Sequence, residues 1–113
     1  EGMFDAHSVC SSPARPDALF CGNDQIARGA IDALRDRNIV IPEDVSVVGF
    51  DDSAVARLMD PPLTSVRQPT AAMGRAMTEA LLAEIAEGRP DSSRLRRPRQ
   101  VVLETELVVR AST

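Results

Sequence analysis

Polar side chains stand at the ends of three short runs of the chain that are predicted strands, and they are the residues best suited to hold a ligand. Asn23 and Asp24 follow the first run, Asp51 and Asp52 the second, and Gln68 the third. A carboxylate accepts hydroxyl hydrogens, whereas an amide both donates and accepts, so this set suits a neutral polyol. A hydrogen bond to a charged group contributes roughly 1.5–3 kcal/mol, and one carboxylate would therefore favour a hydroxylated ligand about 10- to 150-fold over its deoxy analogue.

The same residues also have structural interpretations, which remain open at this point. Asn23 or Asp24 is of a type that caps the first turn of a helix, and one residue is able to cap a helix and bind a ligand. Asp51 and Asp52 would also suit a turn. Paired carboxylates are magnesium ligands too, but the sequence identifies no third oxygen ligand.

Catalytic chemistry has little support in the sequence. The patterns GxGxxG, GxxxxGK[ST], GxSxG and HExxH are absent, and His7 is the single histidine, so no catalytic triad is assembled. Cys10 and Cys21 lack companions at metal-ligand spacing, and Cys21 lies in an apolar run where a thiol behaves as a small hydrophobic group. We therefore expect a binding domain with no catalytic residue, metal or cofactor.

Composition narrows the class of partner. The 113 residues match one domain, and 43% hydrophobic with 27% charged residues is ordinary for a soluble globular protein. No apolar run approaches the ~20 residues that cross a bilayer. The net charge of −4 would repel a phosphate backbone, so this segment itself is expected to bind neither membrane nor nucleic acid.

A strand, helix, strand unit positions the first two groups of polar residues. The pattern predicts a strand at 17–21, a helix at 24–37 ended by a left-handed Asn38, and a buried strand at 45–50. Such a unit is right-handed and places its helix on one face of a parallel sheet, where ligands bind at the carboxyl ends of the strands. The helix face expected to be buried consists of Ala27, Ala30, Ile31 and Leu34.

The remaining elements are shorter or bounded by proline. Pro69 fits the first turn of the longest helix, whose apolar face would comprise Met73, Ala76, Met77, Ala80, Leu81 and Ile85. The expected elements are a helix end at 2–12, a short helix at 53–59, a strand at 63–66, the long helix up to Gly88, an arginine-rich solvated loop at 89–100, and strands at 101–103 and 107–109.

Four segments together carry a family resemblance. Residues 16–30, in which a strand ends in Asn-Asp and opens a helix, and residues 41–52, with the pattern P-x-D-[VI]-S-V-[VI]-G-[FY]-D-D, are two of them. The others are 61–69, followed by Met-Gly, and 103–110. In this order and spacing they resemble the LacI/GalR family of bacterial transcription regulators.

The resemblance implies an α/β fold: part of a type I periplasmic-binding-protein domain, with a parallel Rossmann-like sheet flanked by helices. Residues 1–63 would belong to the second lobe, 64–68 to a crossover, 69–88 to a helix packed on the first lobe, and 101–110 to C-terminal strands. The DNA-reading domain and most of the first lobe are expected to lie outside this chain.

The resemblance also implies a site. Asn23 and Asp51 match positions that hydrogen-bond the effector, and Gln68 matches a crossover residue that lines the cleft. The effector would be a sugar or a nucleoside-like molecule. Thr70 stands where some members carry an aromatic that packs on the ligand, which leaves the identity of the effector open.

The partners implied are a second copy of the chain and operator DNA. Family dimer contacts correspond to Arg28, Leu58 and Met59, whereas DNA would be bound only through the missing N-terminal domain. The protein would be a cytoplasmic repressor in which effector binding between the lobes alters operator affinity.

Two other functions fit parts of the pattern. A periplasmic sugar-binding protein of a transporter shares the fold and cleft, although segment 61–69 favours the repressor. A small flavodoxin-like enzyme or receiver domain would use Asp51 and Asp52 for metal or phosphoryl chemistry.

Overall fold

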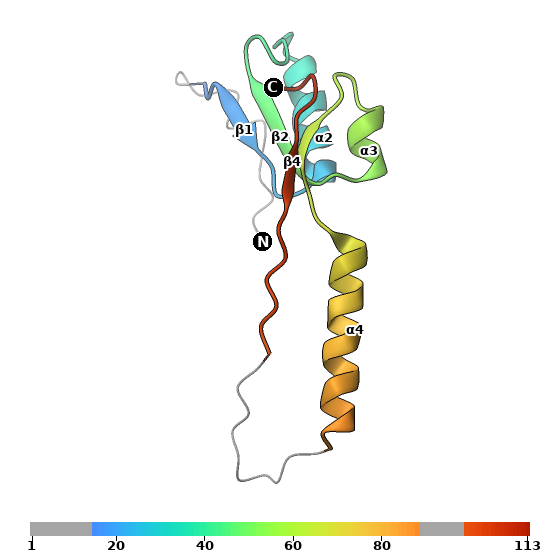
Figure 1. Ribbon diagram of the computed structural model, residues 1–113. Helices are drawn as coiled ribbons and strands as arrows, with labels where there is room; N and C mark the ends of the chain where they lie inside the picture. Colours follow the sequence, from blue (N-terminus) through green and yellow to red (C-terminus); the bar gives the residue numbers. More distant parts are fainter. Residues whose placement is uncertain (1–14, 89–98) are drawn as a thin grey trace. The chain divides into compact units, whose positions relative to one another are not determined.

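The described residues of the computed structural model, 15–88 and 99–113, form two compact units (Figure 1). The described residues before Pro69 join with Glu106–Thr113 in the first unit, and those within Pro69–Thr105 form the second. Several expectations lie outside the described residues: the helix end at 2–12, His7, Cys10 and most of the loop at 89–100.

A four-stranded sheet forms the centre of the first unit. Its strands are β1 (Ala18–Phe20), β2 (Ser46–Asp51), β3 (Thr64–Arg67) and β4 (Glu106–Val108), and they lie in the order β1-β2-β3-β4. The first three are parallel, and β4 runs antiparallel to β3. The expected α/β fold with a parallel sheet is therefore confirmed.

The expected strand at 101–103 is wrong. These residues have extended sequence character, being β-branched and apolar, but among the described residues they pair with no strand, and the closing strand begins only at Glu106. A strand is defined by hydrogen bonds to a neighbour, so an apolar pattern alone does not create one.

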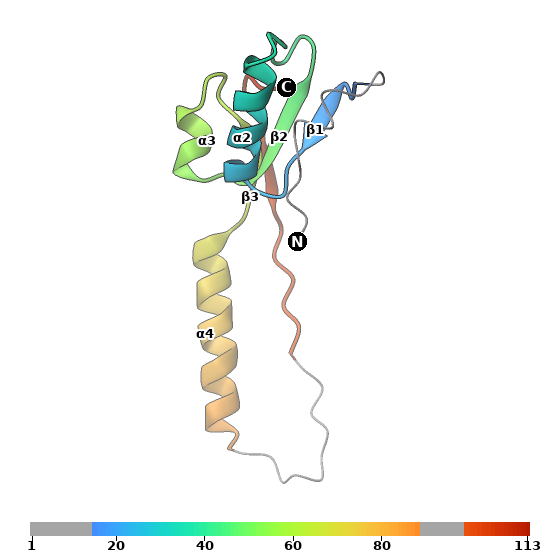
Figure 2. The same cartoon turned by 180° about the vertical axis from the view of Figure 1, so that it is seen from behind.

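Helix α2 (Asp24–Arg35) covers one face of the sheet (Figure 2). Its expected inward stripe is confirmed, since Ala27, Ala30, Ile31 and Leu34 are all buried. These side chains recur at the spacing of one helical face, and burying them against the sheet removes apolar surface from water at roughly 25 cal/mol per Å². Asn38 has the expected left-handed backbone, with φ of 57°.

The short helix α3 (Ala54–Leu58) lies on the same face, beside α2 (Figure 2). It contributes Ala56 to a single hydrophobic core. The burial expected for Cys21 is confirmed, and burial raises the pKa of its thiol. The other buried core residues are Ala27, Ala30, Ile31, Leu34, Val45, Val47 and Leu63.

The end of the chain fastens the amino ends of β2 and β3 to each other. The amide of Val47 donates to the carbonyl of Ser112 at 2.8 Å, and the amide of Thr64 donates to Ser112 Oγ at 2.8 Å. Ser112 Oγ in turn donates to the carbonyl of Val47 at 2.5 Å. The fully buried Ser112 therefore satisfies both strands at the end of the sheet away from the polar residues.

Helix α4 (Thr70–Ala86) belongs to the second unit and starts directly after Pro69, as expected. None of its residues is buried, and its large apolar side chains Met77, Leu81, Leu82 and Ile85 are exposed. Near its end Arg99 pairs with Glu87. Among the described residues, no helix is long and apolar enough to cross a bilayer.

Candidate ligand-binding edge and its ion-pair cluster

The parallel strands bring the expected polar residues to one edge of the sheet. In the register of β2 and β3, Asp51 lies opposite Arg67, and Gln68 is the next residue along the chain. Strand β1 runs beside β2 in the same direction, and Asn23 follows it at the start of α2. Carboxyl ends of parallel strands meet at one edge, where open α/β sheets bind their ligands.

Two of the three expected ligand residues are in direct contact. Gln68 Nε2 donates to Asp51 Oδ1 at 2.5 Å. The Asp51 residue is exposed, and Gln68 is half-buried. A carboxylate has a second oxygen, and an amide has its own oxygen and a second N–H, so the pair retains both acceptor and donor capacity toward a hydroxylated ligand.

Asn23 caps helix α2. Its Oδ1 accepts a hydrogen bond from the amide of Ile26 at 2.8 Å, so the helix-capping interpretation is confirmed for this oxygen. The Nδ2 amide group of Asn23 is a separate donor, and the residue is only half-buried. Capping by the oxygen is therefore compatible with donation from the nitrogen to a ligand.

Asp24 has a different role from its neighbour, because its side chain is buried inside the unit. Only 1% of the residue is exposed. Its Oδ1 accepts from Ser65 Oγ and its Oδ2 accepts from the amide of Ser53, both at 2.6 Å. One carboxylate thus ties α2 to β3 and to the start of α3, and the sequence pattern that suggested a cap gave no sign of these contacts.

Gly49 provides the space for this carboxylate. A Cβ at position 49 would lie 2.4 Å from Asp24 Oδ1 and 2.7 Å from Leu63 Cδ2, both closer than atoms in contact approach. The glycine in the middle of β2 is therefore explained by close approach from neighbouring side chains.

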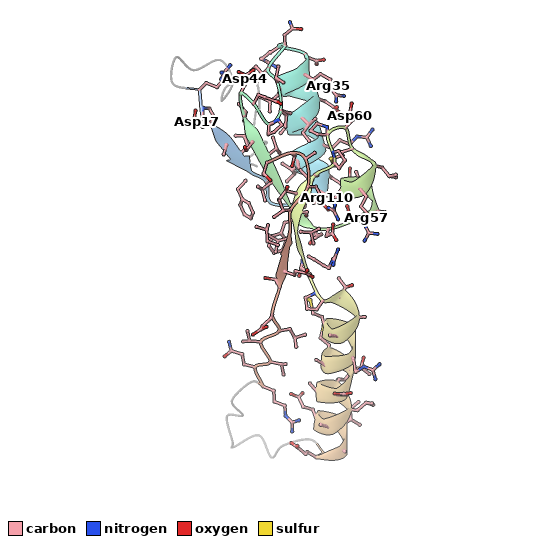
Figure 3. The ribbon with its side chains drawn as sticks, turned by 45° about the horizontal axis from the view of Figure 1, so that its top comes forward. Asp17, Arg35, Asp44, Arg57, Asp60 and Arg110 are labelled. Atoms are coloured by element: carbon pink, nitrogen blue, oxygen red, sulfur yellow. The ribbon has the colours of Figure 1, made fainter. Side chains whose placement is uncertain are left out.

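Asp52 forms the centre of an ion-pair cluster. Its side chain is 1% exposed, and it accepts from Arg67 Nε at 2.7 Å and from Arg110 Nη2 at 2.6 Å. The guanidinium of Arg57 lies 3.9 Å away (Arg57 and Arg110 are labelled in Figure 3). Sequence reasoning missed Arg67 and Arg110 as site residues, because neither has a local signal that connects it to Asp52.

The charge state of the cluster follows from these contacts. Burial by itself would raise the pKa of Asp52, but hydrogen bonds and charge from Arg110 and Arg67 outweigh it and hold the pKa below the usual value. The hydrogen bond to Asp52 is the main cause of a raised pKa at Arg67. Because both carboxylate oxygens of Asp52 already accept from guanidinium groups, the magnesium interpretation of the aspartate pair loses one of its two ligands.

A surface groove is lined by residues of α2, of α3 and of the segment directly after α3. Its volume is about 410 Å³. It contains all three residues expected at a dimer interface, Arg28, Leu58 and Met59, and Leu58 is 84% exposed. The remaining lining residues are Ile31, Asp32, Arg35, Val55 and Asp60.

A mainly parallel sheet with carboxylate and amide groups at its carboxyl edge is typical of an α/β ligand-binding domain. The family model of the periplasmic binding protein-like domain matches residues 3–113. The chain therefore belongs to this family, in the form that LacI-type regulators carry.

Known proteins of this form are similar in sequence and structure. The HTH-type transcriptional regulator MalR of Streptomyces coelicolor is 48% identical over 96 residues, 85% of this chain and 26% of MalR. The ribose operon repressor of Escherichia coli is 38% identical over 95 residues, 83% of this chain and 29% of the repressor. The chain thus spans between a quarter and a third of the length of these two relatives.

Two solved structures with bound sugars have the same fold. A cellobiose complex of the transcriptional regulator CelR superposes with a TM-score of 0.76 at 43% identity, over 86% of this chain and 28% of that chain. A LacI family transcriptional regulator from Lactobacillus casei with bound sucrose also gives a TM-score of 0.76, at 33% identity over 96% of this chain and 38% of that chain.

Proposed function

We propose that this chain is the C-terminal part of the effector-binding domain of a LacI-type transcription repressor, and that its effector is a sugar or a similar small polar molecule. The observation that carries the proposal is the contact between Asp51 and Gln68 at the carboxyl edge of the sheet. The bound cellobiose and sucrose of the related structures support a hydroxylated ligand. The relatives are transcriptional regulators rather than enzymes or transport proteins, which favours repression over the transporter alternative.

The effector would act by shifting a population of two closure states. In this mechanism, Asp51 and Gln68 contribute one wall of a cleft whose other wall lies outside the chain. A ligand that bridges both walls stabilises one closure angle, and a change from 1:99 to 99:1 requires a differential affinity of about 5.5 kcal/mol. The N-terminal domain would then bind or release operator DNA, in the cytoplasm where the operator lies.

The apolar side of α4 supports a larger two-lobed domain. Met77, Leu81 and Ile85 are exposed on one long helix, and at least two-thirds of the length of the similar repressors lies outside the matched region. Large exposed apolar surfaces mark places where another surface packs. We propose that the missing first lobe covers this side of α4.

The groove between α2 and α3 is proposed to contact a second copy of the chain. A two-fold interface must be complementary to itself, and the groove has both signs of charge, with Arg28 and Arg35 opposed by Asp32 and Asp60. Leu58 adds an exposed apolar centre. In the full-length protein, Leu58→Asp should convert dimers to monomers in sedimentation velocity, whereas Val40→Asp, at another exposed apolar residue of the same unit, should not.

The central experiment compares effector response with DNA binding in the full-length protein. Melting temperatures are measured with D-glucose, cellobiose, sucrose and D-ribose, because a ligand that binds the native state raises the melting temperature. In a gel-shift titration, Asp51→Ala should bind operator but fail to respond to the sugar. Asp36→Ala, at an exposed aspartate on the far end of α2, should respond as the wild type does. An unchanged response of Asp51→Ala would remove Asp51 from the site.

A further inference from the structure

The last residue of β2 and the residue after it are two consecutive aspartates with an unusual backbone conformation. Asp51 has φ of 99° and Asp52 has φ of 49°, both in the region that side chains with a Cβ seldom adopt. Such residues persist only where their surroundings hold them. Asp51 is exposed and Asp52 is buried, although they are adjacent in sequence.

Asp52 adds its own contacts to this turn, beside those from Gln68 to Asp51 and from Ser53 to Asp24. Its amide donates to the Oγ of the buried Ser65 at 3.0 Å, and its carboxylate accepts from Arg67 and Arg110. Arg110 is itself fixed, because its Nη1 donates to the carbonyl of Leu63 at 2.7 Å. The turn is therefore attached both to β3 and to the residues that follow β4.

The same cluster fixes the place where the chain leaves and re-enters the unit. Arg67 is the last residue of β3, and the boundary to the second unit falls after Gln68. Arg67 Nη1 also donates to Glu106 Oε2 at 3.2 Å, and Glu106 is the residue at which the chain returns. Asp52 thus pairs with the last residue of β3, directly before Gln68.

We propose that Asp52 is a positioning residue of the effector site. Its ion pairs with Arg67 and Arg110 hold Asp51 and Gln68 in the arrangement that receives the ligand, while Asp52 itself contacts no ligand. The inference rests on the proposed function of Asp51 and Gln68. It adds that sugar affinity depends on a carboxylate buried behind the residues that bind the sugar.

The test separates sugar affinity from stability. For the full-length wild type, affinities for D-glucose, cellobiose, sucrose and D-ribose are measured by isothermal titration, and the sugar that binds is used for every variant. Asp52→Asn should bind that sugar at least roughly tenfold more weakly than the wild type. Mutation of residues that hydrogen-bond to metal ligands weakens metal binding by about this factor. Asp52→Glu restores the charge and should bind more tightly than Asp52→Asn.

A role limited to packing predicts the opposite order, because asparagine has the shape of aspartate and glutamate does not. Wild-type affinity in Asp52→Asn, or tighter binding by Asp52→Asn than by Asp52→Glu, would overturn the inference. The matched control is Arg15→Gln, which removes the exposed ion pair with Asp44 in the same unit (Asp44 is labelled in Figure 3). It should leave affinity unchanged, and an equal loss there would also reject a specific role for Asp52.

Two further variants make every outcome decisive. If Asp52→Asn does not fold, Arg67→Gln takes its place, because the Arg67 side chain is 43% exposed and its loss removes one of the two close ion pairs of Asp52. Unchanged affinity in Arg67→Gln would reject the inference. Asp51→Asn tests the proposed function itself. Loss of binding in Asp51→Asn with normal binding in Asp52→Asn would reject only the positioning role, whereas normal binding in Asp51→Asn, or no sugar bound by the wild type, would reject the proposed function and the inference with it.

Discussion

Replacement of Gly49 by alanine tests whether the buried carboxylate behind the ligand edge is as tightly enclosed as its contacts indicate. The added methyl group would lie 2.4 Å from Asp24 Oδ1 and 2.7 Å from Leu63 Cδ2. Both residues are essentially fully buried, so neither side chain is able to move into solvent without breaking the core. The substitution must therefore shift Asp24, Leu63 or the strand.

The magnitude follows from two contributions. Overpacking a buried site costs about 1–3 kcal/mol, and a weakened hydrogen bond from Ser53 or Ser65 to the Asp24 carboxylate costs about 1.5–3 kcal/mol. Alanine instead of glycine in a strand offsets roughly 0.5–1 kcal/mol of this. We expect the free energy of unfolding to fall by about 1.5–5.5 kcal/mol, a large share of the ~5–15 kcal/mol typical of a domain.

The assay is urea unfolding of the full-length protein, followed by far-ultraviolet circular dichroism. The matched control is Gly29→Ala in α2, where a Cβ meets nothing within 4 Å and alanine should stabilise the helix by roughly 0.5–1 kcal/mol. If Gly49→Ala is as stable as the wild type while Gly29→Ala shows its gain, the enclosed carboxylate does not constrain β2 and the reasoning fails.

Three further outcomes follow from the described contacts. Asn23→Ala should lower the free energy of unfolding by about 1 kcal/mol, because it removes a helix cap, whereas Asn23→Asp should keep the cap; equal stability of the two variants would contradict this. Because burial raises the pKa of Cys21, its thiol should react with Ellman's reagent only after unfolding, and rapid labelling of the native protein at Cys21 would argue against it. The pKa of Asp52 is lowered from its usual value of 3.8 in the folded protein, so its contribution to stability is present above that value and is lost as pH falls through the lowered one. The urea midpoint of the wild type should therefore drop more steeply in this acidic range than that of Asp52→Asn. If the midpoints of the two proteins fall in parallel with pH, the ion pairs of Asp52 do not stabilise the fold.

Local sequence patterns were sufficient to predict most helices and strands of the first unit. The helix at 24–35 has one apolar face and a capping residue before it, and both signals are short-range. The strands at 18–20 and 46–51 are apolar and are followed by polar residues, which is also a local pattern. The strand expected at 101–103 failed for the same reason, because its existence depends on a partner that a local pattern does not specify.

For the candidate site, too, the sequence predicted one part and only the tertiary structure revealed the other. The sequence alone placed Asn23, Asp51 and Gln68 at or just after the ends of successive strands, because the short runs predicted as strands stop there. Only the tertiary structure decided which aspartate of the pair faces solvent and which is buried by Arg67 and Arg110, because Arg110 is 58 residues away from Asp52 along the chain. Alternation of side chains is a property of single strands, whereas the pairing of a buried charge depends on which distant segments the folded sheet brings together.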